Sequence, residues 1–252
     1  MTNKLKYFIA NWKMFGDLTS FKIISMVSKF NNKYNKINKY KIIFCVPNTL
    51  IHTFSNKLKL NSISIGAQNS AHHQHAGPYT GLVNPSMLKA VGAKFVILGH
   101  SENRSQGETN ELIKKKLIES SKKNLEVILC IGESFSEKKQ KKTYHVIKNQ
   151  LRKILNKKMN SNNIILAYEP IWSIGTNNLP KENELRKIIK LIKIECKNIL
   201  KSKKFPKVLY GGSVNPKNVH LFSKITELDG LLIGGASQSS KKFIDIIKNY
   251  YK

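Results

Sequence analysis

Short apolar runs alternate with amphipathic stretches along the whole chain, and this alternation limits the fold more than any other feature. Eight runs have the near-continuous apolar character of strands that are buried on both faces of a sheet. They cover residues 7–11, 42–46, 63–67, 95–98, 127–131, 164–168, 208–210 and 231–233. The stretches between them include helical patterns; the clearest places Leu185, Ile188 and Ile192 on one face. This order predicts repeated βα units and an α/β fold with a parallel sheet.

Eight βα units in 252 residues favour closure into a barrel, since a (β/α)8 barrel takes about 250 residues as one unit. We therefore expect a single-domain (β/α)8 barrel, the TIM barrel, over residues 1–252. An open doubly wound sheet would be expected to carry Gly-x-Gly-x-x-Gly after its first strand, but Asn11-Trp12-Lys13 stands there. Asn84-Pro85 and Asn215-Pro216 predict two helix starts, each with an asparagine cap and a first-turn proline.

The cysteines and the apolar runs indicate a cytoplasmic protein. Cys45, Cys130 and Cys196 are odd in number and widely spaced, which is typical of reduced thiols and not of a disulfide or zinc framework. No run reaches the roughly 18 apolar residues that a membrane span needs. Residues 1–6 enter the first strand without the apolar region of a signal peptide.

The formal charge of +29 raises the alternative of a nucleic-acid-binding protein. Of the 44 basic residues, only Arg104, Arg152 and Arg186 are arginines. Proteins that recognise bases and phosphates favour arginine, because its guanidinium group can donate two hydrogen bonds to one partner. The lysines are also spread over nearly every expected helix. We therefore expect no specific nucleic-acid partner, and a field that steers small anions toward the protein.

Glu169 stands at the end of the sixth apolar run and is followed by Pro170 and an apolar, glycine-containing loop. In a parallel barrel, functional groups sit at the carboxyl ends of strands. Taken alone, Glu169 could equally be a capping or salt-bridged carboxylate. A mobile loop over residues 170–180, here called the lid, would exclude water and make the carboxylate more basic. Glu169 is therefore the candidate base.

His100, Lys13 and Asn11 follow two other apolar runs. A histidine in this position is often only a satisfied core residue, but a helix start at Ser101 would favour its neutral form. A neutral imidazole can donate a hydrogen bond to a carbonyl oxygen. Lys13, directly after a strand-end asparagine, is a candidate for holding negative charge in the barrel mouth.

Two glycine loops follow the last two runs, Gly211-Gly212-Ser213 and Gly234-Gly235. Backbone N–H groups at such loops cradle phosphate dianions, and barrels often place a phosphate site there. Each glycine pair alone would be a weak signal. Together they predict a phosphate site.

His72, His73 and His75 lie together in one expected loop. A metal site is one interpretation of such a cluster. Neighbouring loop histidines rarely share one ion without a carboxylate or cysteine ligand, so we expect no metal.

With these residues in place, the chain resembles the triosephosphate isomerase family from about residue 7 to residue 247. The resemblance rests on Asn11-Trp12-Lys13, Gly99-His100-Ser101-Glu102, Cys130-Ile131-Gly132-Glu133, Tyr168-Glu169-Pro170-Ile171-Trp172, Ile174-Gly175-Thr176, Tyr210-Gly211-Gly212-Ser213-Val214 and Gly234-Gly235-Ala236-Ser237. It implies a (β/α)8 homodimer without a cofactor that interconverts dihydroxyacetone phosphate and D-glyceraldehyde 3-phosphate in glycolysis and gluconeogenesis.

The resemblance also implies a role for each site residue. Glu169 would move the proton through an enediol(ate), His100 would polarise the carbonyl, and Lys13 and Asn11 would stabilise the oxyanion. The residues implied to bind the substrate are Asn11, Lys13, Gly175, Ser213, Gly234 and Gly235. Thr80 resembles the family residue that reaches across the dimer to the partner's site.

The chain departs from the family pattern at the expected interface and in the lid. Leu82 and Asn103 stand where the family has a glutamate and an arginine that pair across the interface, so we expect a less ionic dimer. Ser173 replaces a common alanine, and Asn177-Asn178-Leu179-Pro180 replaces a Gly-Lys hinge, so we expect altered lid motion. The alternatives are a basic nucleic-acid-binding barrel and an enzyme acting on a larger sugar phosphate, for which an apolar lid leaves little room.

Overall fold

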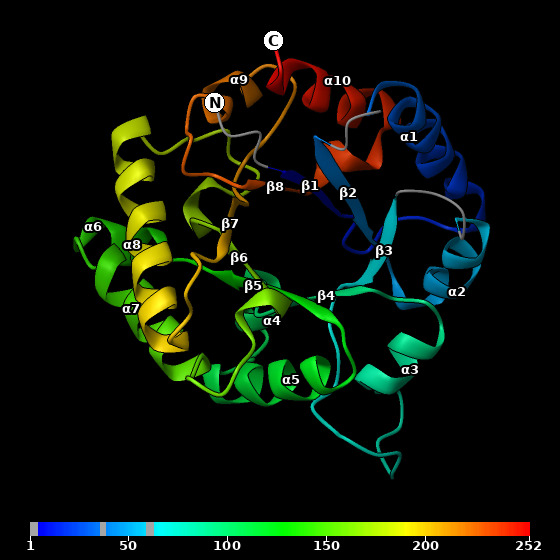
Figure 1. The fold of residues 1–252 in the computed structure, drawn as a ribbon, viewed down its shortest axis with the longest axis horizontal. Coiled ribbons are helices and arrows are strands. Elements are labelled where there is room, and N and C mark those ends of the chain that lie inside the picture. Colours follow the sequence, from blue (N-terminus) through cyan, green and yellow to red (C-terminus); the bar gives the residue numbers. More distant parts are fainter. Residues whose placement is uncertain (1–4, 36–38, 59–62) are drawn as a thin grey trace.

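The computed structural model describes residues 5–35, 39–58 and 63–252. Residues 1–4, which we expected to lead into the first strand and to belong to the single domain, lie outside this part. Within it, eight parallel strands pair in chain order and the last pairs with the first (Figure 1). They are β1 (Lys6–Asn11), β2 (Tyr40–Cys45), β3 (Ser64–Ala67), β4 (Phe95–Leu98), β5 (Glu126–Ile131), β6 (Ile164–Tyr168), β7 (Lys207–Tyr210) and β8 (Gly230–Ile233). The expected closed barrel is confirmed, with each strand within two residues of its predicted bounds.

Helices surround the barrel and cover the outer face of the sheet (Figure 1). They are α1 (Phe21–Tyr34), α2 (Asn48–Lys57), α3 (Pro85–Ala90), α4 (Ser101–Ser105), α5 (Asn110–Lys122), α6 (Phe135–Lys139), α7 (Thr143–Ile154), α8 (Glu182–Leu200), α9 (Val219–Ser223) and α10 (Ser240–Tyr250). None of the helices in the described ranges is long and apolar enough to cross a membrane.

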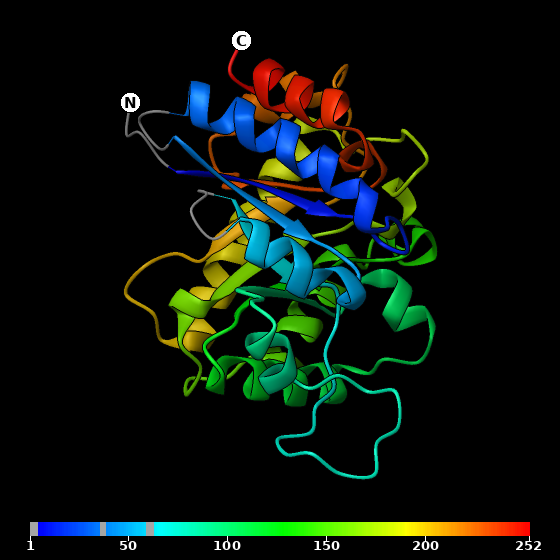
Figure 2. The same cartoon turned by 90° about the vertical axis from the view of Figure 1, so that its right-hand side faces the viewer.

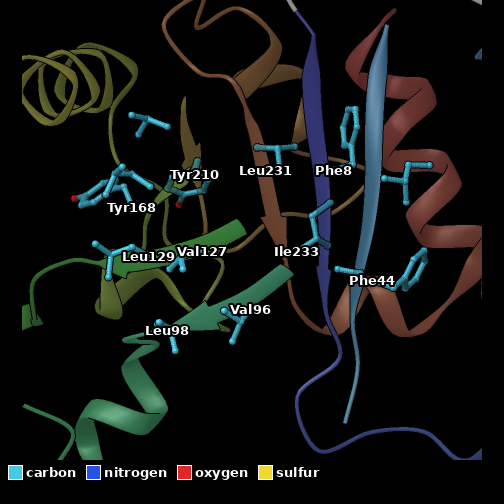
Figure 3. Packing of buried hydrophobic residues seen from close by; sticks show 14 of the residues in the cluster. Phe8, Phe44, Val96, Leu98, Val127, Leu129, Tyr168, Tyr210, Leu231 and Ile233 are labelled. Atoms are coloured by element: carbon cyan, nitrogen blue, oxygen red, sulfur yellow. The ribbon is translucent and has the colours of Figure 1, made fainter. Parts of the chain in front are cut away.

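Two layers of apolar side chains hold the barrel together, because successive residues of a strand point to opposite faces. Along β1, Tyr7 and Ile9 belong to the inner layer with Phe95 and Ile128, whereas Phe8 belongs to the outer layer. The outer layer joins the sheet to the helices, and Figure 3 shows its strand residues around the barrel. The continuous apolar runs therefore reflect burial on both faces, as predicted.

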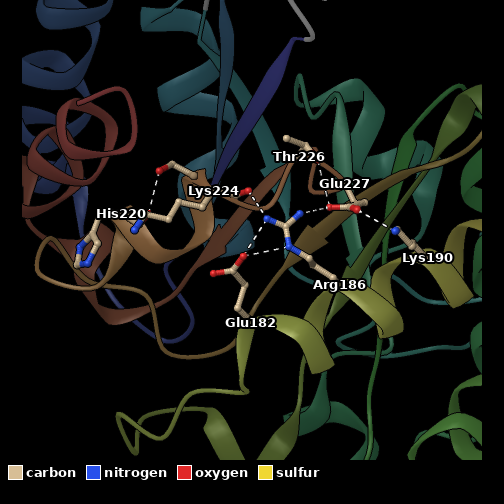
Figure 4. A network of polar contacts seen from close by, with 8 residues as sticks. Glu182, Arg186, Lys190, His220, Lys224, Thr226 and Glu227 are labelled. Carbon is tan, nitrogen blue, oxygen red and sulfur yellow. Dashed lines mark hydrogen bonds and ion pairs between the residues drawn. The ribbon is translucent and has the colours of Figure 1, made fainter. Parts of the chain in front are cut away.

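A polar network fixes α8 against the segment that precedes β8 (Figure 4). The Arg186 guanidinium donates to Glu182 Oε1 at 2.9 Å, to Glu227 Oε2 at 2.6 Å and to the Lys224 carbonyl at 2.5 Å. Lys190 pairs with the other oxygen of Glu227 at 3.3 Å. The network is partly exposed, so we expect only a modest contribution to stability.

One predicted helix start is confirmed and the other is wrong. Asn84 caps α3 by accepting from the Met87 N–H at 2.9 Å, with Pro85 in the first turn. The helix after Asn215 does not begin at Pro216. The Asn215 Oδ1 accepts from the Lys217 and Asn218 N–H groups as a cap would, but residues 216–218 form a turn and α9 begins only at Val219.

Candidate active site

A cavity of about 660 Å³ opens at the carboxyl ends of the strands. All eight site residues predicted from the sequence line it: Asn11, Lys13, His100, Glu169, Gly175, Ser213, Gly234 and Gly235. They come from the ends of β1, β4 and β6 and from the loops after β6, β7 and β8. The barrel therefore brings together groups that lie up to 224 residues apart in the sequence.

Glu169 follows β6 directly and is almost fully buried. Its N–H donates to the Ile131 carbonyl at 2.8 Å, which fixes its backbone against β5. Gly211 leaves room for the side chain, since a Cβ there would lie 2.7 Å from Glu169 Cγ. The β7 loop thus needs a glycine next to this carboxylate.

Burial raises the pKa of the Glu169 carboxyl, while His100, the Cys130 thiol, Lys13 and the Ser101 N–H lower it in part. Within the described residues, no donor has full hydrogen-bond geometry to Glu169 Oε2. The thiol and the Ser101 N–H are thus near enough to act electrostatically without satisfying that oxygen. A buried carboxylate that lines a cavity and has an unsatisfied oxygen is well suited to accept a proton.

His100 is the residue before α4, and its Nδ1 accepts from the Glu102 N–H at 3.2 Å. An Nδ1 that accepts from a backbone N–H carries no proton, so we assign the neutral tautomer with the proton on Nε2. That Nε2 lies 3.3 Å from Glu169 Oε1. Although Glu102 Oε2 also lies 3.6 Å from Nδ1, the backbone donor fixes the tautomer. The helix start thus places a hydrogen-bond donor at the cavity.

Lys13 adopts a left-handed backbone conformation, with φ at 57°. This conformation is costly for a residue with a Cβ and is typical of functional sites. The Asn11 Oδ1 stabilises it by accepting from the Lys13 N–H at 3.1 Å. The Lys13 Nζ pairs with Glu102 Oε1 at 2.5 Å. Glu102 therefore positions both Lys13 and, through its N–H, His100, a role that the sequence analysis missed because these contacts join separate strand ends.

The two glycine loops also line the cavity, together with Lys217 and Lys242. Trp12 anchors the second loop, because its Nε1 donates to the Ser237 carbonyl at 3.2 Å and its carbonyl accepts from Gln238 at 3.0 Å. The lid residues Ile174, Gly175 and Asn177 line the same cavity. In this arrangement an anion can meet backbone N–H groups and lysine side chains together.

The lid begins with a single 3₁₀ turn at Ile171–Ser173. The Trp172 Nε1 donates to Glu133 Oε1 at 2.8 Å, and the Tyr168 hydroxyl lies 3.1 Å from both oxygens of Glu133. The Lys138 Nζ lies 3.4 Å from the centre of the Trp172 ring. Glu133 therefore anchors the first part of the lid. We had included it in a motif without a role, since a buried glutamate after β5 gives no sign of its partner.

The cavity is larger than we expected from an apolar lid. With the lid in this position, about 660 Å³ is open, which would admit a sugar phosphate of more than three carbons. The volume of this cavity alone therefore does not exclude a larger sugar phosphate.

The three loop histidines lie outside this cavity. The His72 and His73 ring centres are 4.0 Å apart, and His73 stacks on Tyr79 at 3.5 Å. In the part of the chain that the structure describes, no group of three or more His, Cys, Asp or Glu side chains is placed to hold a metal ion. The cluster is thus an aromatic stack within the loop between β3 and α3.

Comparison with known proteins was consistent over nearly the whole chain. A family model described as triosephosphate isomerase matches residues 6–250. The chain is 38% identical to triosephosphate isomerase of Dictyoglomus thermophilum over 97% of this chain and 99% of that protein. It is 39% identical to that of Wolbachia pipientis over 97% and 93%. The crystal structure of triosephosphate isomerase from Bartonella henselae superposes with a TM-score of 0.88, at 30% identity, covering 98% of this chain and 99% of that one.

Proposed function

The chain belongs to the triosephosphate isomerase family, an aldose–ketose isomerase family of glycolysis, and we propose that it interconverts dihydroxyacetone phosphate and D-glyceraldehyde 3-phosphate with Glu169 as the base. The observation that carries the assignment of residues is the pairing of a buried carboxylate with a neutral imidazole donor, 3.3 Å apart and facing one cavity. The same reaction run in the other direction serves gluconeogenesis.

In the proposed mechanism, the Glu169 carboxylate takes a proton from the carbon next to the carbonyl group. The electron pair of that C–H bond moves toward the carbonyl oxygen and forms an enediol(ate). The Nε2–H of His100 donates to this oxygen and moves a proton between the two substrate oxygens. The Glu169 carboxyl then returns its proton to the neighbouring carbon. A glutamate base combined with a neutral histidine that polarises the carbonyl is the mechanism known for this family.

Lys13 and the Asn11 side chain stabilise the negative charge that develops on the oxygen. Such preorganised donors contribute about 2.7–4 kcal/mol each in other enzymes. The pairing of Lys13 with Glu102 supports this role, since it holds the ammonium group at the cavity.

The phosphate group is assigned to the glycine loops that line the cavity. The backbone N–H groups of Ser213, Gly234, Gly235 and, in the lid, Gly175 would hold its oxygens. Gly175 has φ at 72°, a conformation that favours glycine. We propose that the lid moves over the bound substrate, which removes water from Glu169 and restricts the cavity to a triose.

We also propose that residues 1–252 form one catalytic domain and that two copies form a homodimer. The loop between β3 and α3 projects from the barrel and carries Thr80 (Figure 2). Leu82 and Met87 expose about half of their surface near this loop, and Met14 is fully exposed beside a second groove. Such exposed apolar side chains support an interface. The three free, buried cysteines support a reducing, cytoplasmic location.

The basic residues do not form a single block along the chain, so the high positive charge does not favour a nucleic-acid-binding function. The lysines are spread over the helices, and several already pair with carboxylates of the same helix or a neighbouring one. Steering of the phosphorylated substrate is the role that we assign to the charge.

The test is conversion of D-glyceraldehyde 3-phosphate, coupled to a glycerol-phosphate dehydrogenase, for the wild type, Glu169→Gln and Glu111→Gln. Loss of a general base costs about 10²–10⁴-fold in rate, so Glu169→Gln should fall by at least that factor. Glu111→Gln removes a carboxylate at the start of α5, away from the cavity, and should keep full activity. A folded wild type without activity would show that the chain has the fold of the family but does not catalyse its reaction.

A further inference from the structure

Gln150 lies on α7 and binds both backbone polar groups of Gly132, the residue that follows β5. Its Oε1 accepts from the Gly132 N–H at 3.0 Å, and its Nε2 donates to the Gly132 carbonyl at 2.9 Å. One orientation of the amide alone satisfies both groups, since the N–H needs an acceptor and the carbonyl needs a donor. Gly132 is buried, so both of its groups need a partner.

The Gln150 side chain takes the place of a strand that has ended. β4 pairs with β5 as far as Leu129, and the chain then turns into α4. On the other side of β5 the pairing continues, because the Glu169 N–H donates to the Ile131 carbonyl at 2.8 Å. Successive residues of a parallel strand direct their backbone groups to opposite neighbours. Gly132 therefore faces the side on which β4 has ended, and Gln150 supplies the two bonds that a strand would make there.

Gly132 also lies against the backbone of Glu169. A Cβ at Gly132 would lie 1.9 Å from the Glu169 carbonyl oxygen and 3.3 Å from the Pro170 nitrogen, so the two backbones approach as closely as a glycine allows. This contact and the bond from the Glu169 N–H to the Ile131 carbonyl together set the position from which the carboxylate side chain extends. A shift of Gly132 would therefore move the carboxylate.

α7 gives Gln150 a rigid support. The helix packs on the barrel through a fully buried apolar stripe made of Ile147, Leu151 and Ile154. Gln150 itself lines a separate polar cavity of about 450 Å³ between α6 and α7, here called the outer cavity. Because this cavity is large enough to admit water, loss of the Gln150 amide should loosen the segment after β5 without unfolding the protein.

We propose that Gln150 is a positioning residue that fixes the Glu169 carboxylate through the backbone of Gly132. This proposal rests on the assignment of Glu169 as the base. A displacement of about 1 Å in a reacting group can cost about 100-fold in rate, so a clamp on the backbone beside the base affects the proton transfer. Gln150 is not among the described residues that line the active-site cavity. It should therefore affect the chemical step and leave phosphate binding unchanged.

The first test compares the wild type with Gln150→Met, which keeps the length of the side chain and removes both of its hydrogen-bonding groups. We expect kcat to fall about 10- to 100-fold. The inhibition constant of glycerol 3-phosphate, which has the phosphate but no carbonyl group, should stay within about twofold. A role in stability alone would lower Tm and leave kcat unchanged at a temperature where both proteins are folded. That result would overturn the proposal, and so would an equal loss of kcat and of affinity for glycerol 3-phosphate.

Gln140→Met is the matched control, because Gln140 lines the same outer cavity and its amide donates to Ser136 Oγ, four residues earlier, at 3.2 Å. Its kcat should stay within about twofold of the wild type. If Gln150→Met does not fold, Gln150→Ala replaces it, since the shorter side chain opens the outer cavity to water at Gly132. A wild type without isomerase activity would refute the proposed function, whereas an active wild type with an equally active Gln150→Met would refute the role of Gln150 alone.

The pH profile of kcat/KM shows whether Glu169 is the group that moves. Gln150→Met changes no charge, so any shift of the acid limb comes from the surroundings of the carboxylate. Burial raises the pKa of Glu169, and a looser segment after β5 would let water reach it. The acid limb of Gln150→Met should therefore move to lower pH, toward the ordinary glutamate pKa of about 4.3. A fall in kcat with an unchanged acid limb would show that Gln150 does not act on Glu169.

Discussion

The Nε2 atom of His100 lies 3.3 Å from Oε1 of Glu169, and both side chains are almost fully buried at the ends of β4 and β6, on either side of β5. The Nδ1 of His100 is occupied by the Glu102 N–H, so the Nε2 proton is directed at the carboxylate. The contact places the donor that we assign to the substrate carbonyl beside the carboxylate that we assign as the base. We expect the substrate to bind where both groups can reach it.

The pH dependence of kcat/KM should show a raised pKa for Glu169. Only the carboxylate form is a base, and burial raises the pKa of this carboxyl. Activity should therefore be lost, as the pH falls, at a pH above the ordinary glutamate pKa of about 4.3. A profile of kcat/KM between about pH 4 and pH 8 measures this, because it reports the free enzyme.

Cys130→Ala gives a directional check on the same profile. The thiol lowers the pKa of Glu169 by its contact with the carboxylate, so its removal should move the acid limb to higher pH. An acid limb at the ordinary glutamate value in both proteins would show that Glu169 is solvated when the enzyme is free.

Glu169→Gln should stabilise the protein at neutral pH while it removes activity. The folded pKa of Glu169 lies above its unfolded value, so ionisation at neutral pH favours the unfolded state. The free energy of unfolding should rise by about 1 kcal/mol. As the pH falls through the folded pKa, the wild type binds a proton in the folded state and the difference should shrink. Urea unfolding of both proteins at pH 7 and at about pH 5 would decide this, and a gain that is independent of pH would exclude the carboxylate as its cause.

The fold was predictable because its signals are local. The continuous apolar runs indicate strands buried on both faces, and their number and spacing favour a closed barrel. The site residues were predictable for the same reason, since a strand end such as Glu169 or His100 can be located from the run before it. The closed barrel then brings the strand ends to one cavity, independently of the conformation of the loops between them.

The remaining features depend on contacts between segments that are distant in the sequence. The partner of Lys13 is Glu102, 89 residues away, and the partner of Trp172 is Glu133. No local pattern indicates either pair. Asn215 was misassigned because an asparagine before a proline looks the same in a turn as at a helix start: its Oδ1 accepts from the Lys217 and Asn218 N–H groups, yet α9 begins only at Val219.

Lys193 on α8 and Asp229 before β8 form a buried ion pair at 2.7 Å, with the Val208 N–H on the same carboxylate oxygen. Lys193→Met would remove the buried cation that lies 2.7 Å from Asp229, and breaking a buried ion pair costs about 3–5 kcal/mol. Lys193→Met with Asp229→Asn should recover a large part of this loss, because the remaining group is neutral. Chemical denaturation at pH 7 measures both, and equal stability of the single and double variants would show that the charge of Asp229 is not the reason.

The proposed dimer gives a last prediction, at the positions where the chain departs from its family. Leu82 is half-exposed on the projecting loop, and Asn103 lines the groove that also contains Lys13 and Met14. Asn103→Arg alone should place an unpaired cation in the interface, at a cost of about 3–5 kcal/mol if it is fully buried. Leu82→Glu together with Asn103→Arg should restore much of the lost stability, because the two charges can then pair across the interface. Sedimentation equilibrium and thermal melts at several protein concentrations measure the effect. Equal losses in the single and double variants would mean that these two positions do not meet in the dimer, and a wild type that sediments as a monomer would remove the interface altogether.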